Sequence, residues 1–106
     1  MNPAPRIPLD YEKIKAFCEK WKITEFSLFG SVLTDDFRPD SDVDVLVEFA
    51  EDARWGLFDM VHMEDELKEV FGRDVDLLTR RSVEANENYI VRKNILRSTR
   101  RVYAAR

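Results

Sequence analysis

Cysteine is nearly absent from this chain of 106 residues, and long apolar runs are absent altogether. The one cysteine, Cys18, excludes a disulfide within the chain and a zinc site built from clustered cysteines; its setting, IKAFCEKW, indicates helix packing. No stretch approaches the ~20 apolar residues of a membrane helix, and the N-terminus MNPAPRIPLDYEK lacks an apolar signal core. We therefore expect a cytoplasmic protein that does not contact a membrane.

The residues that are present fit one compact domain spanning residues 1–106, with 44% hydrophobic and 36% charged side chains. The net charge of -4 is unevenly spread, because residues 35–76 hold 15 acidic and 4 basic side chains, whereas residues 80–106 hold 2 acidic and 8 basic ones. The acidic centre argues against nucleic acid as a direct ligand. The basic tail is better explained by a protein contact or a solvated helix face.

The hydrophobic pattern predicts helices that alternate with three strands, which is typical of an α/β layer fold. Asp10 is placed to cap the first helix and Gly72 to end the second. A short helical turn is expected at Val32–Asp35. The expected helices are Leu9–Trp21, Trp55–Phe71 (with Leu57, Met60, Val61 and Leu67 in its apolar stripe) and a closing helix marked by Ile90, Val91, Ile95 and Leu96; the expected strands are Thr24–Gly30, Asp42–Phe49 and Asp74–Thr79.

Alternating aspartates enter the second predicted strand in the segment FGSVLTDDFRPDSDVDVLVEF. Residues two apart in a strand face the same side, so Asp42 and Asp44 share a face with Leu46, and Val43 and Val45 face the core. Two carboxylates ~4 Å apart repel by about 4 kcal/mol at an effective dielectric constant of about 20. Such a pair takes up a proton or binds a cation, and its oxygen ligands suit Mg²⁺ or Mn²⁺.

The third predicted strand repeats this arrangement, with Asp74 and Asp76 on one face. If the two strands are neighbours, Asp76 can join Asp42 and Asp44, and Asp74 is the reserve candidate for the third ligand. Gly30 and Ser31, between a strand and a helical turn, could offer backbone N–H groups and a hydroxyl to the phosphates of a nucleotide.

A Gly-Ser pair followed, ten residues later, by Asp-x-Asp in a hydrophobic strand resembles the signature of the nucleotidyltransferase superfamily that includes DNA polymerase β and kanamycin nucleotidyltransferase. EDELKEVFGRDVDLLT is similar to the helix, glycine and third-carboxylate strand of its smallest members, the MNT-type minimal nucleotidyltransferases. The resemblance spans about Phe26 to Tyr103. It implies a nucleotidyltransferase fold, in which a small mixed β-sheet of three core strands packs against helices.

The resemblance also implies roles for five residues. Asp42, Asp44 and Asp76 would be the catalytic and metal-binding residues, holding two Mg²⁺ ions, with Mn²⁺ as an alternative. Gly30 and Ser31 would bind the triphosphate. The reaction would move AMP from ATP onto a hydroxyl acceptor.

The acceptor is expected on a partner or another subunit, because the chain is too short to include the acceptor-presenting domain of larger members. Minimal nucleotidyltransferases resemble the antitoxin of pairs whose other half is a helical HEPN-family RNase toxin, neutralised by adenylylation of a tyrosine. The resemblance thus implies ATP and a HEPN-type protein as partners, and leaves a homo-oligomer open.

Two other functions and two residue roles stay open. The chain could be a catalytically silent module that neutralises a partner by binding. It could also be a calcium-binding loop, because Asp40, Asp42, Asp44, Glu48 and Glu51 match an EF-hand pattern, although Val45 stands where glycine is needed.

Many relatives carry a basic residue just after Gly-Ser; here Arg38 is a candidate substitute. Glu64, within an apolar stripe, either orders a nearby group or lies at the stripe's edge.

Overall fold

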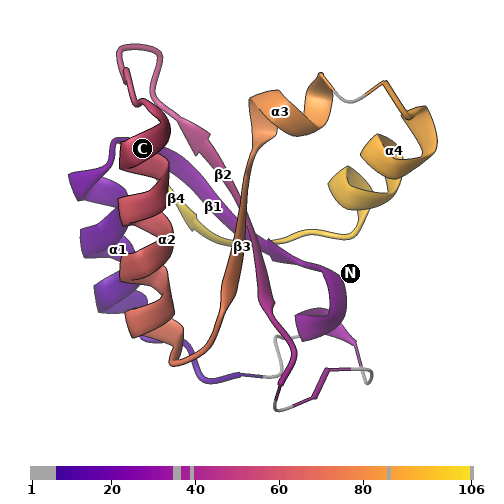
Figure 1. Cartoon of the computed structure of the whole chain (residues 1–106), viewed down its shortest axis with the longest axis horizontal. Helices are drawn as coiled ribbons and strands as arrows, with labels where there is room; N and C mark the ends of the chain where they lie inside the picture. The colour runs from indigo at the N-terminus through magenta and orange to yellow at the C-terminus, as the bar shows by residue number, and fades with distance from the viewer. Residues whose placement is uncertain (1–6, 35–36, 39, 86, 106) are drawn as a thin grey trace.

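The computed structural model describes residues 7–34, 37–38, 40–85 and 87–105 (Figure 1). The three predicted strands and three predicted helices are all present, with ends shifted by one or two residues. The elements, in chain order, are α1 (Tyr11–Lys20), β1 (Ile23–Phe29), the 3₁₀ helix η1 (Gly30–Leu33), β2 (Val43–Phe49), α2 (Leu57–Phe71), β3 (Val75–Thr79), α3 (Arg80–Glu84), α4 (Tyr89–Arg97) and β4 (Arg100–Ala104).

The strands form one mixed sheet in the order β3-β2-β1-β4. β1 runs antiparallel to both β2 and β4, whereas β2 and β3 are parallel. The predicted α/β fold with a mixed sheet is therefore confirmed. The sheet has a fourth strand, β4, that was not expected, because its RRVYA sequence is short and basic. Charged residues of this kind are common on edge strands, where they discourage pairing with other chains.

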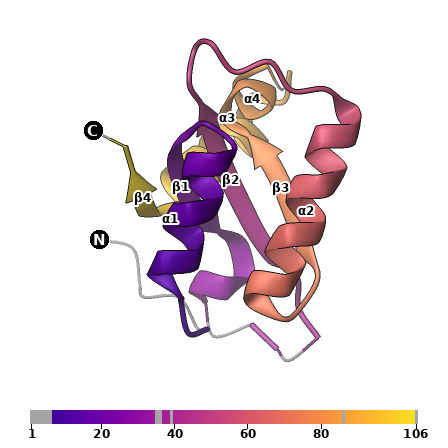
Figure 2. The ribbon, with the colours of Figure 1, turned by 90° about the vertical axis from the view of Figure 1, so that its left-hand side faces the viewer.

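Helices α1 and α2 cover one face of the sheet (Figure 2). The valine face of β2 lies against them, and Val43, Val45 and Val47 are buried in the main core. Cys18 packs in the same core as an apolar group, since burial raises the pKa of its thiol to about 12. The other face carries a smaller core, in which Leu46 of β2 clusters with Phe29 and Val83, and Leu78 and Ile95 pack against this cluster.

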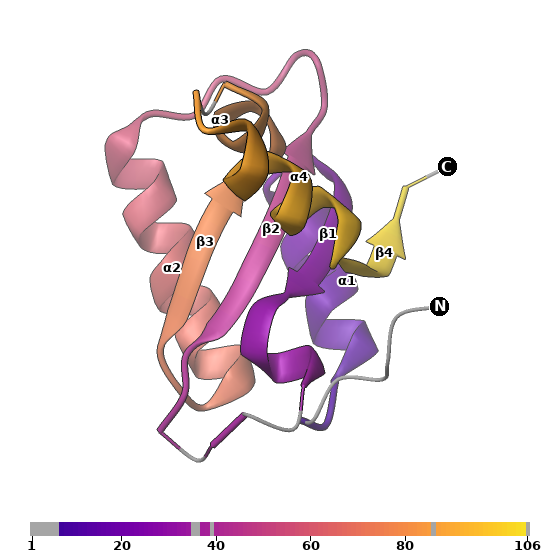
Figure 3. The same cartoon turned by 90° about the vertical axis from the view of Figure 1, so that its right-hand side faces the viewer.

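The second face of the sheet is covered at one end only. α3 and α4 lie across the end where β2 and β3 finish, while at the end where β2 and β3 begin, the part of the chain that the structure describes places only the 3₁₀ helix η1 (Figure 3). The predicted caps are in place: Asp10 Oδ1 accepts a hydrogen bond from Lys13 N–H, and Gly72 ends α2 in the left-handed conformation. Among the described residues, no helix combines the length and apolar character needed to cross a membrane.

Candidate active site

Gly30 begins η1 at the point where the backbone must turn away from β1. Its φ of +76° lies in the left-handed region that favours glycine. Phe29, the residue before it, pairs with Asp44 of β2. A Cβ built on Gly30 would clash with Asp44 Oδ2 and lie 3.2 Å from Asp44 Cγ. Glycine is therefore needed here both for the backbone angle and to admit the carboxylate of Asp44.

Asp44 and Asp76 lie opposite each other on neighbouring strands. The parallel register pairs Asp44 of β2 with Asp76 of β3. Because side chains alternate along a strand and Val43 and Val45 face the main core, these carboxylates point to the other face, where η1 lies. The adjacency on which the predicted role of Asp76 depended is thus present in the sheet.

The electrostatics of Asp44 reflect this crowding of negative charge. Its side chain is half-buried, whereas those of Asp42 and Asp76 are exposed. Burial first, and then the negative charges of Asp76 and Asp42, together raise the pKa of Asp44 to about 6. The structure therefore brings Asp42 and Asp76 within electrostatic reach of Asp44. Asp74, the reserve candidate for the third ligand, pairs with β2 through its backbone: its carbonyl accepts a hydrogen bond from Val43 N–H at 3.0 Å.

The carboxylates of Asp44 and Asp76 suit Mg²⁺ because they form a pair of ligands on one side of the ion, not a set of ligands that encloses it. Within the described residues, no three His, Cys, Asp or Glu side chains form a group that could hold a metal ion. Mg²⁺ commonly binds proteins through one or two carboxylates and completes its shell with water and substrate phosphates. Asp44 and Asp76 offer donors of this kind on one sheet face, so the residues present fit a metal whose remaining positions are taken by water or by substrate phosphates.

Ser31 lies in η1 beside Gly30, with a half-buried side chain. Its carbonyl accepts hydrogen bonds from Thr34 N–H at 2.9 Å and from Thr34 Oγ1 at 3.0 Å, and these close the turn. The turn expected at Val32–Asp35 begins two residues earlier than predicted, at Gly30, and Asp35 lies outside the described residues. The earlier start brings Gly30 and Ser31 into the turn itself.

Arg73 is a residue near the site that sequence reasoning missed. It follows Gly72 after α2, and its Nη1 donates to the carbonyls of Arg38 and Ser41, just before Asp42. Arg38 is exposed and takes part in these contacts through its backbone. Arg73 and Lys68 also line a cavity of about 440 Å³, together with three aspartates, Asp40, Asp42 and Asp74. No local pattern marks Arg73, because the contacts join segments 32 to 35 residues apart.

Glu64 of α2 reaches the outer edge of the sheet. Its Oε1 accepts a hydrogen bond from the N–H of Leu77 at 3.5 Å, in a partly buried setting. Leu77 follows Asp76 in β3, which is an edge strand. Of the two roles left open by the sequence, the structure favours the one in which Glu64 orders a nearby group, here the backbone of β3.

The calcium-loop alternative is wrong. Residues 43–49 form the extended strand β2, and Val45 is fully buried in the main core. A twelve-residue EF-hand loop has to turn sharply at its sixth position so that its ligands surround one ion. Because a strand rises about 3.3 Å per residue, Asp44 and Glu48 lie about 13 Å apart along β2 and cannot enclose one ion.

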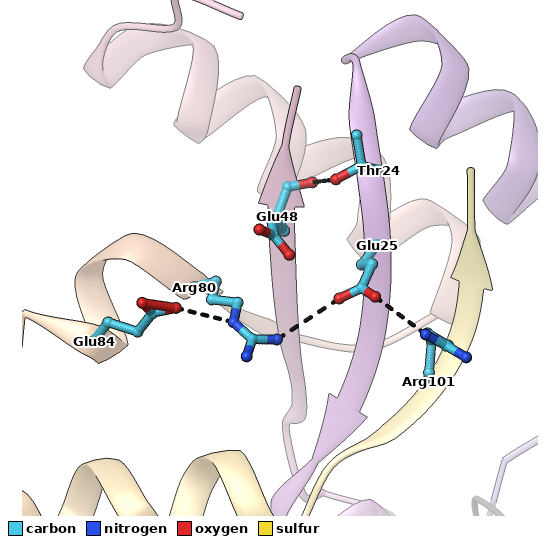
Figure 4. A network of polar contacts seen from close by, with 6 residues as sticks. All are labelled: Thr24, Glu25, Glu48, Arg80, Glu84 and Arg101. Carbon is cyan, nitrogen blue, oxygen red and sulfur yellow. Dashed lines mark hydrogen bonds and ion pairs between the residues drawn. The ribbon is translucent and has the colours of Figure 1, made fainter. Parts of the chain in front are cut away.

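A network of charged side chains lies four residue pairs along the sheet from the Phe29–Asp44 pair, where β1 and β2 pair Glu25 with Glu48 (Figure 4). Glu25 accepts from Arg101 of β4 at 3.1 Å and lies 3.7 Å from Arg80 of α3, which also pairs with Glu84 at 3.0 Å. These contacts tie α3 and β4 to β1. They hold two cations of the basic tail, Arg80 and Arg101, against β1.

The chain resembles known proteins over most of its length. Residues 11–102 match the sequence profile of the family described as "Nucleotidyltransferase domain". A protein of Methanocaldococcus jannaschii whose name includes the words "protein adenylyltransferase" is 39% identical over 71 residues, which cover 67% of this chain and 74% of that protein. The "Protein adenylyltransferase MntA" of Thermococcus cleftensis is 31% identical over 83 residues, 78% of each chain.

A solved structure with a similar fold contains a tri-AMPylated Shewanella oneidensis HEPN toxin in complex with an MNT antitoxin. It matches with a TM-score of 0.62 and 20% sequence identity, over 90% of this chain and 70% of that one. At this level of identity the likeness shows a shared fold only.

Proposed function

Because the chain belongs to the nucleotidyltransferase-domain family, we propose that it transfers AMP from ATP to a hydroxyl group of a partner protein in a Mg²⁺-dependent reaction. The observation that carries this proposal is the pairing of Asp44 with Asp76 on neighbouring strands, with Gly30 packed against Asp44. This arrangement gathers negative charge at the open end of the sheet, where a cation and the phosphates that it binds would compensate it.

Each predicted residue has a defined role in this reaction. Gly30 and Ser31 would hold the triphosphate through backbone N–H groups and the serine hydroxyl. Asp42, Asp44 and Asp76 would hold two Mg²⁺ ions, or Mn²⁺ in their place. The bound ions would supply positive charge to neutralise the charge that develops on the phosphates. Asp76, which is exposed, would also accept the hydrogen bond of the attacking hydroxyl and orient it.

The covalent change is a displacement at the α-phosphorus of ATP. The acceptor oxygen forms a bond to that phosphorus, the bond to the β-phosphate oxygen breaks, and pyrophosphate leaves. The hydroxyl proton passes to solvent through the group that orients the hydroxyl. Nothing is oxidised or reduced, and the products are an AMP ester of the partner and pyrophosphate.

The proposed acceptor is a tyrosine on a helical HEPN-type toxin, so that the chain acts as an antitoxin. Two relatives have names that include "protein adenylyltransferase", and a solved structure of similar fold pairs an AMPylated HEPN toxin with its antitoxin.

The test is to incubate the purified chain with Mg²⁺ and α-labelled ATP, with and without the helical protein encoded beside its gene. Label is expected on a tyrosine of that protein, found by mass spectrometry as one added AMP. The double variant Asp42→Asn, Asp44→Asn should abolish labelling, whereas the control Asp65→Asn, Glu69→Gln, which changes two exposed acids of α2, should not. Labelling that survives in the first variant would contradict the assigned site.

A silent interaction module is the second candidate. The absence of a three-ligand group among the residues that the structure describes favours it over an enzyme with a preformed metal cage. It predicts that the chain binds and inhibits the partner without ATP, and that the Asp42→Asn, Asp44→Asn variant inhibits equally well. Inhibition that requires both ATP and these aspartates would rule this candidate out.

A further inference from the structure

We propose that Arg73 is a positioning residue for Asp42, because it clamps the segment that leads into β2 and thereby holds Asp42 ready to bind metal. This inference rests on the proposed function, and it assigns a role to a residue outside the Gly-Ser and Asp-x-Asp motifs. The segment concerned comprises the described residues 37–38 and 40–42, and we refer to it as the approach segment.

Arg73 makes three contacts with the approach segment. Its Nη1 donates to the carbonyl of Arg38 at 3.2 Å and to the carbonyl of Ser41 at 3.3 Å. The guanidinium carbon lies 4.6 Å from the centre of the Phe37 ring, a cation–π distance. Phe37 in turn packs against the main core. The half-buried Arg73 side chain therefore connects the approach segment to the body of the molecule.

The approach segment is also folded on itself. The N–H of Ser41 donates to the carbonyl of Arg38 at 3.0 Å, and the N–H of Arg38 donates to Ser41 Oγ at 3.0 Å. Both carbonyls that Arg73 contacts thus belong to the residues at the two ends of one turn. The carbonyl of Ser41 is part of the peptide bond to Asp42, so the clamp acts directly on the backbone of this carboxylate.

The chain is held on the other side of Asp42 as well. The N–H of Val43 donates to the carbonyl of Asp74 at 3.0 Å. Arg73 and Asp74 are consecutive, so one short connection between α2 and β3 holds the backbone both before and after Asp42. The Asp42 side chain itself is exposed and free to reach an ion. Groups that orient metal ligands in this way typically change metal affinity or activity by about 10- to 100-fold when they are removed.

The charge of Arg73 allows a test in which positioning and electrostatics predict opposite results. Arg73 and Asp42 line one cavity, so the cation opposes the binding of a second cation there. If only charge mattered, Arg73→Ala would tighten metal binding and Arg73→Lys would leave it unchanged. If the clamp matters, both variants weaken metal binding, because neither side chain can bond two carbonyls from one planar group.

The probe is Mn²⁺, and the readout is the signal of free Mn²⁺ in electron paramagnetic resonance with the full chain and no ATP. We expect the Kd for Mn²⁺ to rise about tenfold in Arg73→Ala, with a smaller rise in Arg73→Lys. Arg54→Ala is the matched control: Arg54 Nη1 also donates to two loop carbonyls, those of Glu51 and Ala53, after β2 and away from the carboxylates. It should leave the Kd unchanged.

Two results would overturn the inference, and they have different consequences. An Arg73→Ala chain that binds Mn²⁺ as tightly as the wild type, or more tightly, removes the positioning role but leaves the proposed function intact. Mn²⁺ binding that Asp42→Asn does not weaken removes the metal site, and with it both proposals. If Arg73→Ala fails to fold by circular dichroism, the Arg73→Lys variant decides, and an unchanged Kd there also overturns the inference.

Discussion

At the scale of single residues, Gly30 and Gly72 allow backbone strain to be separated from contact with the site. Both have a left-handed φ, of +76° and +70°, but a Cβ on Gly30 would clash with Asp44, whereas one on Gly72 would meet nothing within 4 Å. We expect Gly72→Ala to lower the free energy of unfolding by about 1 kcal/mol, from the backbone angle alone. Gly30→Ala should lower the free energy of unfolding by at least about 1 kcal/mol more than Gly72→Ala does, because overpacking adds about 1–3 kcal/mol to the cost of the backbone angle.

Urea denaturation of the two variants measures this difference, and nucleotide transfer gives a second readout. Gly30→Ala should also lose transfer, because the added methyl group displaces the Asp44 carboxylate, whereas Gly72→Ala should retain it. Equal stability and equal activity in the two variants would show that the contact between Gly30 and Asp44 has no functional weight.

Asp44 sets the expected pH dependence of the chain without metal. Its pKa in the folded state is raised to about 6, from burial first and then from Asp76 and Asp42, above the 3.8 of an ordinary aspartate. The folded state therefore binds a proton more tightly than the unfolded one, so this group's contribution to stability falls as the pH rises from about 4 to about 6. At pH 7.5 the ionised carboxylate is destabilising.

Asp44→Asn in EDTA tests this sign. The variant should unfold at a higher temperature than the wild type at pH 7.5, and the difference should shrink towards zero below about pH 4, where both side chains are neutral. Thermal unfolding followed at both pH values measures it. A variant that is less stable than the wild type at pH 7.5 would contradict the inference that the ionised carboxylate of Asp44 destabilises the folded state.

At the scale of elements, β3 is an edge strand that carries a site residue, and α2 supports it. Glu64 of α2 accepts from the N–H of Leu77, directly after Asp76. The 3.5 Å separation makes this a long hydrogen bond, so Glu64→Ala should lower the free energy of unfolding by about 1 kcal/mol, less than the roughly 1.5–3 kcal/mol of a typical bond to a charged acceptor. Glu64→Gln, which keeps an acceptor oxygen, should lose less.

Amide hydrogen exchange locates this effect more directly than global stability. The N–H of Leu77 should exchange faster in Glu64→Ala than in Glu64→Gln, while amides of β1 keep their wild-type rates relative to overall stability. Asp65→Ala, at an exposed position of the same helix, is the matched control. Unchanged protection of Leu77 in Glu64→Ala would mean that α2 does not hold the edge of β3 through this residue.

The elements also show what local sequence could and could not predict. Alternation of valine and aspartate predicted β2 and which of its faces is buried, since this pattern depends only on neighbouring residues. The apolar spacing predicted α2 and most of its buried side, since Leu67 is buried and Met60 packs against the main core. It was wrong for Leu57 and Val61, which are 79% and 48% exposed. Which side of an apolar helix is buried is decided by the sheet against which it packs.

At the scale of the whole molecule, the basic tail is partly neutralised by the rest of the chain. Arg101 and Arg80 converge on Glu25, an acid of β1, so β4 and α3 are joined to the sheet through charge (Figure 4). Exposed pairs of this kind contribute little to stability, about 0–1 kcal/mol each. Their main effect is local, because they fix Arg80 and Arg101 beside Glu25 of β1.

The parts of the site that sequence could not predict depend on this arrangement. Asp42 and Asp44 were identifiable from one segment, but the place of Asp76 beside Asp44 required that β2 and β3 be neighbours. Arg73 required more, since its contacts join the end of α2 to a turn more than 30 residues earlier. Contacts between distant segments follow from the packed fold and leave no periodic trace in the chain.

The central claim is that carboxylates gathered at one end of the sheet direct AMP transfer, and one paired labelling experiment tests it most directly. The chain and its helical partner are incubated with Mg²⁺ and ATP labelled at either the α- or the γ-phosphate. We predict label on the partner from α-labelled ATP only, and none from either in the Asp42→Asn, Asp44→Asn variant. Label from γ-labelled ATP, or α-label that persists in that variant, would contradict the account.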